Sequence, residues 1–136
     1  MALNNYDVIF IDDEITIVDL FNQYVQYKYK DWHAVAFTDS YDLYRKIIGN
    51  EVAATIWIVD LMMPQKNGTE IAEAIARESM PGTLILGYTA LDPYTLDSRP
   101  EYRGGLKYFY KIINKQESFT SLLELIDLWV KQGPPI

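Results

Sequence analysis

The sequence predicts an α/β protein with a doubly wound, five-stranded parallel sheet. Short apolar runs alternate along the chain with segments whose apolar residues recur at helical spacing. The run at residues 8–11 is continuously apolar, which is typical of a strand covered on both faces. Right-handed crossovers between such strands favour the strand order 2-1-3-4-5, with helices on both sides of the sheet.

The individual elements follow from these runs and from the residues that interrupt them. Strands are expected at residues 8–11, 34–37, 54–59, 84–88 and 107–110. Helices are expected at about residues 16–29, 40–48, 69–79 and 118–131. Asp39 and Ser40 offer an N-cap for the second helix, and Gly49 with Asn50 ends it.

Residues 91–105 break this alternation. The segment contains Pro93, Pro100 and the pair Gly104-Gly105, and its apolar residues do not recur at helical spacing. An irregular or shortened fourth helix is therefore expected. Residues 1–132 are expected to form one domain, and residues 133–136 a tail or the start of a linker.

Composition limits the classes of function. A chain of 136 residues suits one domain, and its net charge of −7 disfavours binding to nucleic acid or to an anionic membrane. Cysteine is absent, which excludes disulfides, thiolate nucleophiles and cysteine-based zinc sites. No apolar run reaches the length of about 18 residues that a membrane span needs. A cytoplasmic protein is the default expectation.

Acidic side chains follow two of the predicted strands. Asp12, Asp13 and Glu14 follow the first strand, and Asp60 follows the third. In the predicted order these strands are neighbours at the switch point, where doubly wound sheets bind ligands. Clustered carboxylates are costly unless a cation lies among them. Asp12, Asp13 and Asp60 could together bind one Mg²⁺, with a backbone carbonyl as a further ligand.

The other strand ends carry groups that suit phosphoryl transfer. A carboxylate such as that of Asp60 can attack phosphorus and form an acyl phosphate. The transferred group then needs hydrogen-bond donors and positive charge around its oxygens. Thr89 follows the fourth strand and Lys111 the predicted fifth, so a hydroxyl and an ammonium group are expected at the same edge.

The sequence resembles the receiver domains of two-component response regulators over nearly its whole length. The segments that carry the resemblance are Phe10-Ile11-Asp12-Asp13-Glu14, Ile58-Val59-Asp60-Leu61-Met62-Met63-Pro64 with Gly68, Tyr88-Thr89-Ala90 and Tyr108-Phe109-Tyr110-Lys111. The resemblance implies a flavodoxin-like strand order and a phosphorelay signalling protein. Such a protein catalyses only the phosphorylation and dephosphorylation of its own aspartate, so it is not an enzyme in the usual sense.

The resemblance also implies the phosphoryl donor and the metal ligands. Asp60 would be the phosphoacceptor, and the donor would be a phosphohistidine of a sensor histidine kinase or of a phosphotransfer protein. Asp13 would bind Mg²⁺ directly, and Asp12 largely through water. The backbone carbonyl of Met62 would be another ligand.

A switch and an output are implied as well. Thr89 would move toward the phosphoryl group, Lys111 would pair with that group, and Tyr108 would swing inward. The output would be a contact with a downstream effector protein or domain, and a homodimer is one expected form of assembly. Met62 and Leu91 occupy the positions that tune dephosphorylation, and neither can orient a water molecule, so a long-lived phosphoryl group is expected.

Two departures from the family and two rival functions follow from the same residues. Ile112 follows Lys111 where the family usually has a cis proline, and a cis bond before Ile costs about 2.5–4 kcal/mol, so a trans bond is expected. Because the fourth helix is expected to be irregular, the sequence does not decide whether the chain forms the symmetric dimer that is usual in the family.

A pseudo-receiver that is never phosphorylated is the main rival. A phosphatase with an aspartyl nucleophile needs Asp-x-Asp after its first strand, which Asp12-Asp13 does not provide. The chain is either a stand-alone receiver or a piece of a longer protein.

Overall fold

The computed structural model describes residues 3–79 and 82–135, and it contains a five-stranded parallel sheet. The strand order is β2-β1-β3-β4-β5, as predicted. The strands are β1 (Asn4–Ile11), β2 (Ala34–Phe37), β3 (Val52–Asp60), β4 (Leu84–Thr89) and β5 (Lys111–Asn114). β1 and β3 lie side by side, with Ile11 opposite Val59, so the residues that follow them lie at one edge of the sheet.

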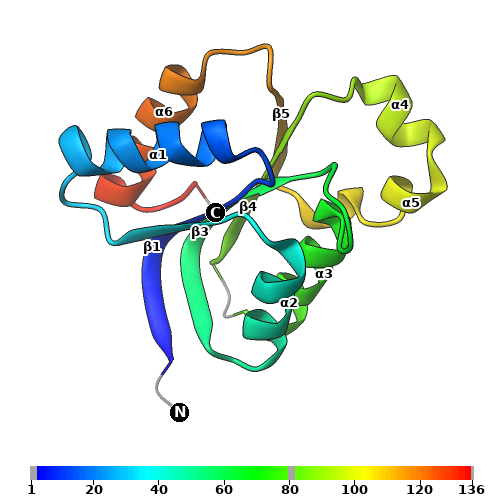
Figure 1. The fold of residues 1–136 in the computed structure, drawn as a ribbon, viewed down its shortest axis with the longest axis horizontal. Helices are drawn as coiled ribbons and strands as arrows, with labels where there is room; N and C mark the ends of the chain where they lie inside the picture. The colour runs from blue at the N-terminus through cyan, green and yellow to red at the C-terminus, as the bar shows by residue number, and fades with distance from the viewer. Residues whose placement is uncertain (1–2, 80–81, 136) are drawn as a thin grey trace.

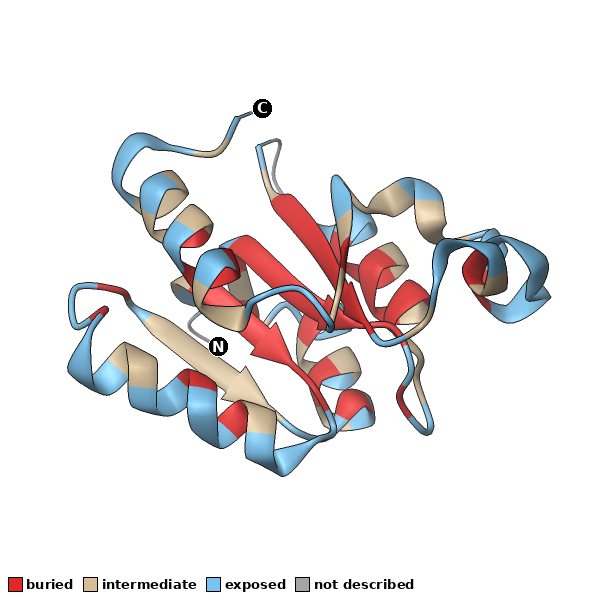
Figure 2. Ribbon diagram, turned by 90° about the horizontal axis from the view of Figure 1, so that it is seen from above, coloured by how far each residue is buried: buried red, intermediate tan, exposed pale blue. Residues whose placement is uncertain are grey.

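Helices cover both faces of the sheet (Figure 1). On one face lie α1 (Ile15–Tyr27) and α6 (Phe119–Gln132), and on the other lie α2 (Ser40–Ile48) and α3 (Gly68–Glu78). Figure 2 shows that the central strands are buried while the outer faces of the helices are exposed. The two hydrophobic cores therefore hold β1, β3 and β4 rigidly between the helical layers.

The helix starts follow the capping chemistry of the sequence. The side chain of Asp39 accepts hydrogen bonds from the backbone N–H groups of Tyr41 and Asp42, which confirms the predicted N-cap. Asn67 and Glu70 form a capping box at the start of α3. This second cap fixes the point at which the loop after β3 turns into a helix.

The segment after β4 contains only short helices, as expected. They are α4 (Pro93–Ser98), α5 (Pro100–Arg103) and the 3₁₀ helix η1 (Leu106–Tyr108). Leu96 and Tyr102 are buried and form a small third core with Leu61, the residue directly after Asp60. A side chain on Gly105 would overlap the Cβ of Thr69 in α3, so this segment packs closely against the start of α3.

The expected fifth strand at residues 107–110 is wrong. Tyr108 ends η1, and the half-buried rings of Tyr108 and Phe109 pack against the core on the α2 and α3 side. The strand is instead Lys111–Asn114, in which Ile113 is buried. Both segments contain a short β-favouring run, a lysine directly follows each segment, and only packing against the sheet distinguishes them.

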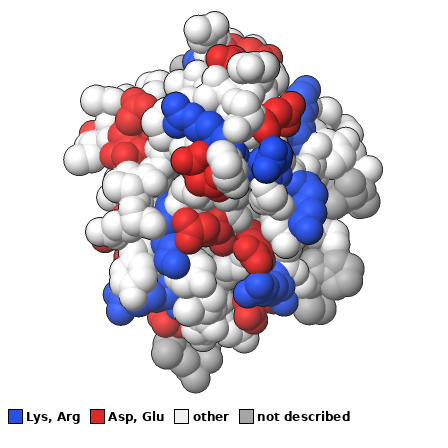
Figure 3. Space-filling model, turned by 90° about the vertical axis from the view of Figure 1, so that its right-hand side faces the viewer, with Lys and Arg blue, Asp and Glu red and all other residues white. Residues whose placement is uncertain are grey.

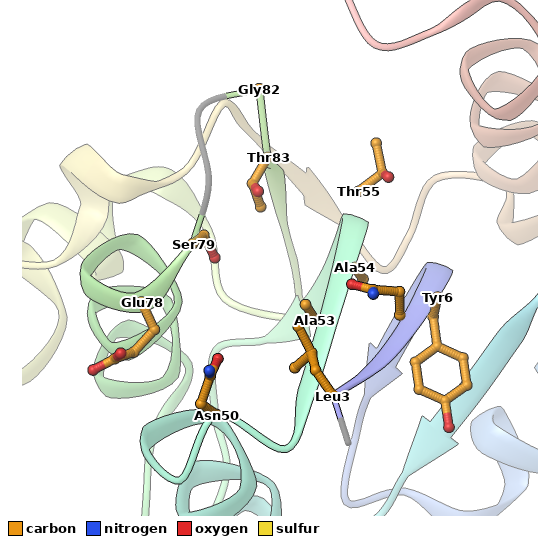
Figure 4. Close-up of a pocket in the computed structure, with 11 residues that line it drawn as sticks. Leu3, Tyr6, Asn50, Ala53, Ala54, Thr55, Glu78, Ser79, Gly82 and Thr83 are labelled. Carbon is orange, nitrogen blue, oxygen red and sulfur yellow. The ribbon is translucent and has the colours of Figure 1, made fainter. Parts of the chain in front are cut away.

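A hollow of about 550 Å³ lies at the end of the sheet where the strands begin. β3 begins at Val52, whereas its pairing with β4 begins only at Ile56, so the start of β3 projects beyond β4. Figure 4 shows the side chains of Asn50, Ser79 and Thr83 around this projecting segment. The hollow lies at the amino ends of the strands, whereas Asp12, Asp13 and Asp60 lie at their carboxyl ends. Within residues 3–79 and 82–135, no helix has both the length and the apolar character needed to cross a membrane.

Candidate phosphoacceptor site

The three predicted carboxylates meet at the carboxyl edge of the sheet. Asp12 and Asp13 follow β1, and Asp60 is the last residue of β3. One carboxylate oxygen from each lies within 4.8 Å of the others. Asp12 and Asp60 are buried, whereas Asp13 is exposed, so the group has one open side toward solvent.

Local hydrogen bonds orient the two buried carboxylates. Oδ1 of Asp12 accepts a bond of 2.9 Å from the backbone N–H of Glu14, and Oδ1 of Asp60 accepts one of 3.3 Å from that of Met62. The other oxygen of Asp12, Oδ2, is buried and accepts no hydrogen bond. Oδ2 of Asp12 therefore remains available to interact with a cation.

The cation in the site is Lys115. Its Nζ lies 2.9 Å from Oδ2 of Asp12 and 3.6 Å from Oδ2 of Asp60. The first contact lacks hydrogen-bond alignment and is an ion pair. Glu14 supplies a third carboxylate, and its Oε1 accepts a hydrogen bond of 3.0 Å from the same ammonium.

The prediction that Lys111 occupies this position is therefore corrected. Lys111 is exposed at the start of β5, opposite Leu86, whereas Lys115 directly follows the strand. The misplaced strand caused the error, because the pattern took Lys111 as the residue after β5. A second signal was present in the sequence: the run Ile112-Ile113 also leads, through Asn114, to a lysine.

Two further expectations depended on Lys111. The residue after the lysine of the site is Gln116, not Ile112, and no cis peptide bond occurs in the part of the chain that the structure describes. The switch role of Tyr108 was based on its spacing from Lys111, and the same spacing from Lys115 leads to Ile112. Ile112 is half-buried and packs against the third core, beside Leu96 and Tyr102.

Thr89 lies at the end of β4, where the sequence places it. It is fully buried, and its Oγ1 accepts a hydrogen bond of 3.1 Å from the backbone N–H of Leu91. Its backbone carbonyl accepts a bond of 2.7 Å from the N–H of Lys115. Thr89 and the lysine of the site are thus joined directly through the backbone.

The loop after Asp60 is held by close packing and by one buried hydroxyl. A side chain on Gly68 would overlap the carbonyl oxygen of Asp60, so only glycine allows α3 to start this close to β3. Ser40 Oγ donates a hydrogen bond of 2.8 Å to the carbonyl of Pro64 and accepts one of 3.2 Å from the N–H of Lys66. The sequence offered Ser40 only as part of an N-cap, a position that Asp39 occupies, so the role of Ser40 in this loop was missed.

Burial dominates the electrostatics of Asp60. Loss of solvation, together with the negative charge of Asp12, raises the pKa of Asp60 to about 8, although Lys115 opposes the shift. Burial lowers the pKa of Lys115, but its close contact with the Asp12 carboxylate and the charge of Asp60 outweigh this and raise it. Two carboxylates and one ammonium group leave net negative charge in a poorly solvated site.

The donor set fits Mg²⁺. Every candidate ligand is an oxygen, the three carboxylates converge, and Oδ2 of Asp12 has no hydrogen-bond donor. The side chain of Met62 is about half exposed, and its backbone lies next to the carboxylates. A divalent cation bound here would offset the excess negative charge that raises the pKa of Asp60.

Comparisons with known proteins agree with this geometry. The sequence profile of the response regulator receiver domain matches residues 8–126. No curated protein matches the chain. Among solved structures, the receiver domain of the Francisella response regulator 1452 superimposes with a TM-score of 0.70 at 18% identity, covering 96% of this chain and 100% of that one.

Two further structures have the same fold. Response regulator TrrA of Thermotoga maritima, in complex with Mg²⁺ and BeF, gives a TM-score of 0.68 at 19% identity and covers 93% of this chain and 98% of its own. The chemotaxis protein CheY4 of Vibrio cholerae gives 0.66 at 19% identity, with the same two coverages. The profile match spans most of the chain, and this chain therefore belongs to the response regulator receiver family.

Proposed function

We propose that the protein is a phosphoryl-accepting receiver that takes its phosphoryl group onto Asp60. The observation that carries the proposal is the position of the Lys115 ammonium, which reaches both Asp12 and Asp60 among three converging carboxylates. A nucleophilic carboxylate beside a fixed positive charge is the arrangement that phosphoryl transfer requires.

The reaction is a displacement at phosphorus. A carboxylate oxygen of Asp60 forms the new O–P bond, and the P–N bond of a phosphohistidine breaks. The electron pair of that bond passes to the imidazole nitrogen of the donor, which takes up a proton from solvent. Lys115 and the hydroxyl of Thr89 stabilise the charge on the phosphoryl oxygens after transfer.

Mg²⁺ would be held by Asp12, Asp13, Asp60 and the backbone carbonyl of Met62. When bound, it supplies positive charge that offsets the carboxylates and the incoming phosphoryl oxygens. Asp60 must be ionised to attack, so the charges around it control its reactivity. Within the chain, Lys115 performs this task by favouring the carboxylate form.

The partners follow from this chemistry and from the surface. The donor is a sensor histidine kinase or a phosphotransfer protein, and the output is a contact with an effector protein or domain, or a homodimer. Figure 3 shows acidic and basic side chains interspersed on the face that includes α4 and α5. Mixed charge and a net charge of −7 suit a protein partner in the cytoplasm better than nucleic acid. Residues 1–132 are proposed as the receiver, with residues 133–136 as a tail or the start of a linker.

The decisive experiment is intact-mass spectrometry after incubation with acetyl phosphate and Mg²⁺. We expect the mass of one added phosphoryl group, which disappears in Asp60→Asn. Metal binding is measured separately, as a rise in thermal stability on adding Mg²⁺ that is lost in Asp13→Asn. If neither acetyl phosphate nor a cognate kinase adds a group, the protein is a pseudo-receiver that acts as a constitutive interaction module.

A further inference from the structure

The turn that carries Lys115 has an unusual construction. Gln116 follows Lys115, and the peptide bond between them is trans. The receiver family usually has a cis proline at that position, and the proline helps to aim the lysine. Something else in this chain must hold the turn so that the Lys115 ammonium lies between Asp12 and Asp60.

The side chain of Asn114 contacts both sides of this turn. Its Oδ1 accepts a hydrogen bond of 2.8 Å from the backbone N–H of Gln116, which closes an Asx turn around Lys115. Its Nδ2 donates a bond of 3.3 Å to the carbonyl of Leu91, in the loop after β4. One amide group thus fixes the backbone after Lys115 and attaches it to the loop that follows Thr89.

Backbone hydrogen bonds complete the arrangement. The N–H of Lys115 donates to the carbonyl of Thr89 at 2.7 Å, and the N–H of Glu117 donates to the carbonyl of Asn114 at 2.9 Å. The first bond fixes the backbone on the side of Lys115 that faces β4, and the second closes the turn across Lys115 and Gln116. The carboxylate of Glu117 also accepts a hydrogen bond of 3.3 Å from the backbone N–H of Asn114. Within residues 3–79 and 82–135, only the side chain of Asn114 joins the N–H after Lys115 to a neighbouring segment.

We propose that Asn114 is a positioning residue, which aims the Lys115 side chain into the acidic site in place of a cis proline. This inference depends on the proposed function, since the aim of Lys115 matters for phosphoryl transfer. Asn114 does not touch the reacting atoms. It acts through the turn, and it couples the position of Lys115 to the loop that begins after Thr89.

The first test observes Lys115 directly and needs no phosphorylation. Lysine is labelled with ¹³C at Cε, and the Lys115 signal is assigned with Lys115→Met. In the unaltered protein we expect two distinct Hε shifts for an ordered side chain. In Asn114→Ala these shifts should merge toward the values of the exposed lysines, while the methyl spectrum of the core stays unchanged. Unmerged shifts would overturn the proposal.

The second test measures phosphorylation of Asp60 by acetyl phosphate as a function of donor concentration. Asn114→Ala should lower the maximal rate by about tenfold to a hundredfold, as expected for a displaced catalytic group. The donor concentration at half-maximal rate and the affinity for Mg²⁺ should change less than twofold, by about the error of such constants. An unchanged maximal rate would contradict the proposal.

Two variants separate positioning from general damage. Gln116→Ala alters the same exposed turn but keeps the backbone N–H that Asn114 binds, so it should behave like the unaltered protein. Asn114→Ser keeps a neutral acceptor for that N–H but cannot reach Leu91, and it should recover part of the order of Lys115. Equal loss in Asn114→Ser and Asn114→Ala would overturn the role of the turn. If the unaltered protein is never phosphorylated, only the proposed function fails, because the NMR test still reports on Asn114.

Discussion

Lys115 Nζ lies 2.9 Å from Oδ2 of Asp12, in the position that the sequence pattern assigned to Lys111. The ion pair forms because β5 ends at Asn114, opposite Thr89, so that the next residue lies at the carboxyl edge of the sheet. Lys111 is at the other end of the same strand and points to solvent as an exposed residue. The two lysines therefore provide a matched pair for testing which ammonium serves the site.

Exchange of each lysine for methionine should separate their roles. Lys115→Met removes the positive charge beside Asp60 and should slow phosphorylation by acetyl phosphate by about a hundredfold or more. In enzymes, the loss of one group that stabilises transition-state charge has an effect of this size. Lys111→Met should leave the rate within about twofold, because an exposed lysine contributes little to a distant site. Equal rates in the two variants, measured by intact mass over time, would refute the assignment.

The two lysines show which parts of the fold and of the site could be predicted from the sequence. Strand order, the three carboxylates, Thr89 and the shortened fourth helix all depend on continuous apolar runs or on helix breakers, which act locally. The end of β5 depends on which of two adjacent runs pairs with β4, and that choice is made by packing of Phe109 and Ile113. A register that tertiary contacts decide cannot be determined from local preference.

Asp60 should make the metal-free protein less stable as pH rises. Its pKa is about 8 in the folded protein and near 3.8 when unfolded, so the folded state holds an extra proton between these values. Stability is greatest below the unfolded value and is lost up to about pH 8. We expect a loss of about 3–4 kcal/mol between pH 5 and pH 8, at up to about 1.4 kcal/mol per pH unit.

The control is Asp60→Asn, which cannot titrate. Urea unfolding of both proteins without divalent cations, at pH 5 and pH 8, gives the difference in free energy of unfolding that belongs to Asp60. The variant should be more stable than the unaltered protein at both values, and by a clearly larger margin at pH 8 than at pH 5. Parallel pH curves would show that the carboxyl is ionised throughout.

Substitution of Gly105 should destabilise the protein, whereas substitution of Gly104 should not. A Cβ at Gly105 would overlap the Cβ of Thr69, so Gly105→Ala must move η1 away from α3 and should cost about 1–3 kcal/mol. Gly104 has open space around it and helical backbone angles of −69° and −21°. Gly104→Ala should therefore stabilise the protein by about 0.4–1 kcal/mol. Urea unfolding midpoints compare the two, and equal midpoints would contradict the packing of this segment.

Asp127 should stabilise the packing of α6 against the segment before β2 through one partly buried hydrogen bond. Its Oδ1 accepts a bond of 2.9 Å from Nε1 of Trp32, a residue that is only 5% exposed. Asp127→Ala leaves that N–H without its partner and should cost about 1–3 kcal/mol in urea unfolding. Lys131→Ala removes only the exposed ion pair to the same carboxylate and should leave the midpoint unchanged. A loss of equal size in both variants would assign the effect to the ion pair.

The phosphoryl group on Asp60 should be long-lived, and Met62 is one cause. Hydrolysis needs a water molecule oriented toward phosphorus, and a thioether neither donates nor strongly accepts a hydrogen bond. Met62→Asn supplies an amide next to Asp60 and should speed the loss of the phosphoryl group by about tenfold, which is less than the factor of about 10²–10⁴ for a general acid or base because an amide orients the water without taking its proton. Because Met62 is 45% exposed, the exchange removes little core packing.

Leu128→Asn is the control: Leu128 is 46% exposed on α6, so this exchange makes the same kind of change away from the site and should leave the lifetime unaltered. Lifetimes are read from intact mass after removal of acetyl phosphate, and rapid loss in the unaltered protein with Mg²⁺ would contradict the prediction.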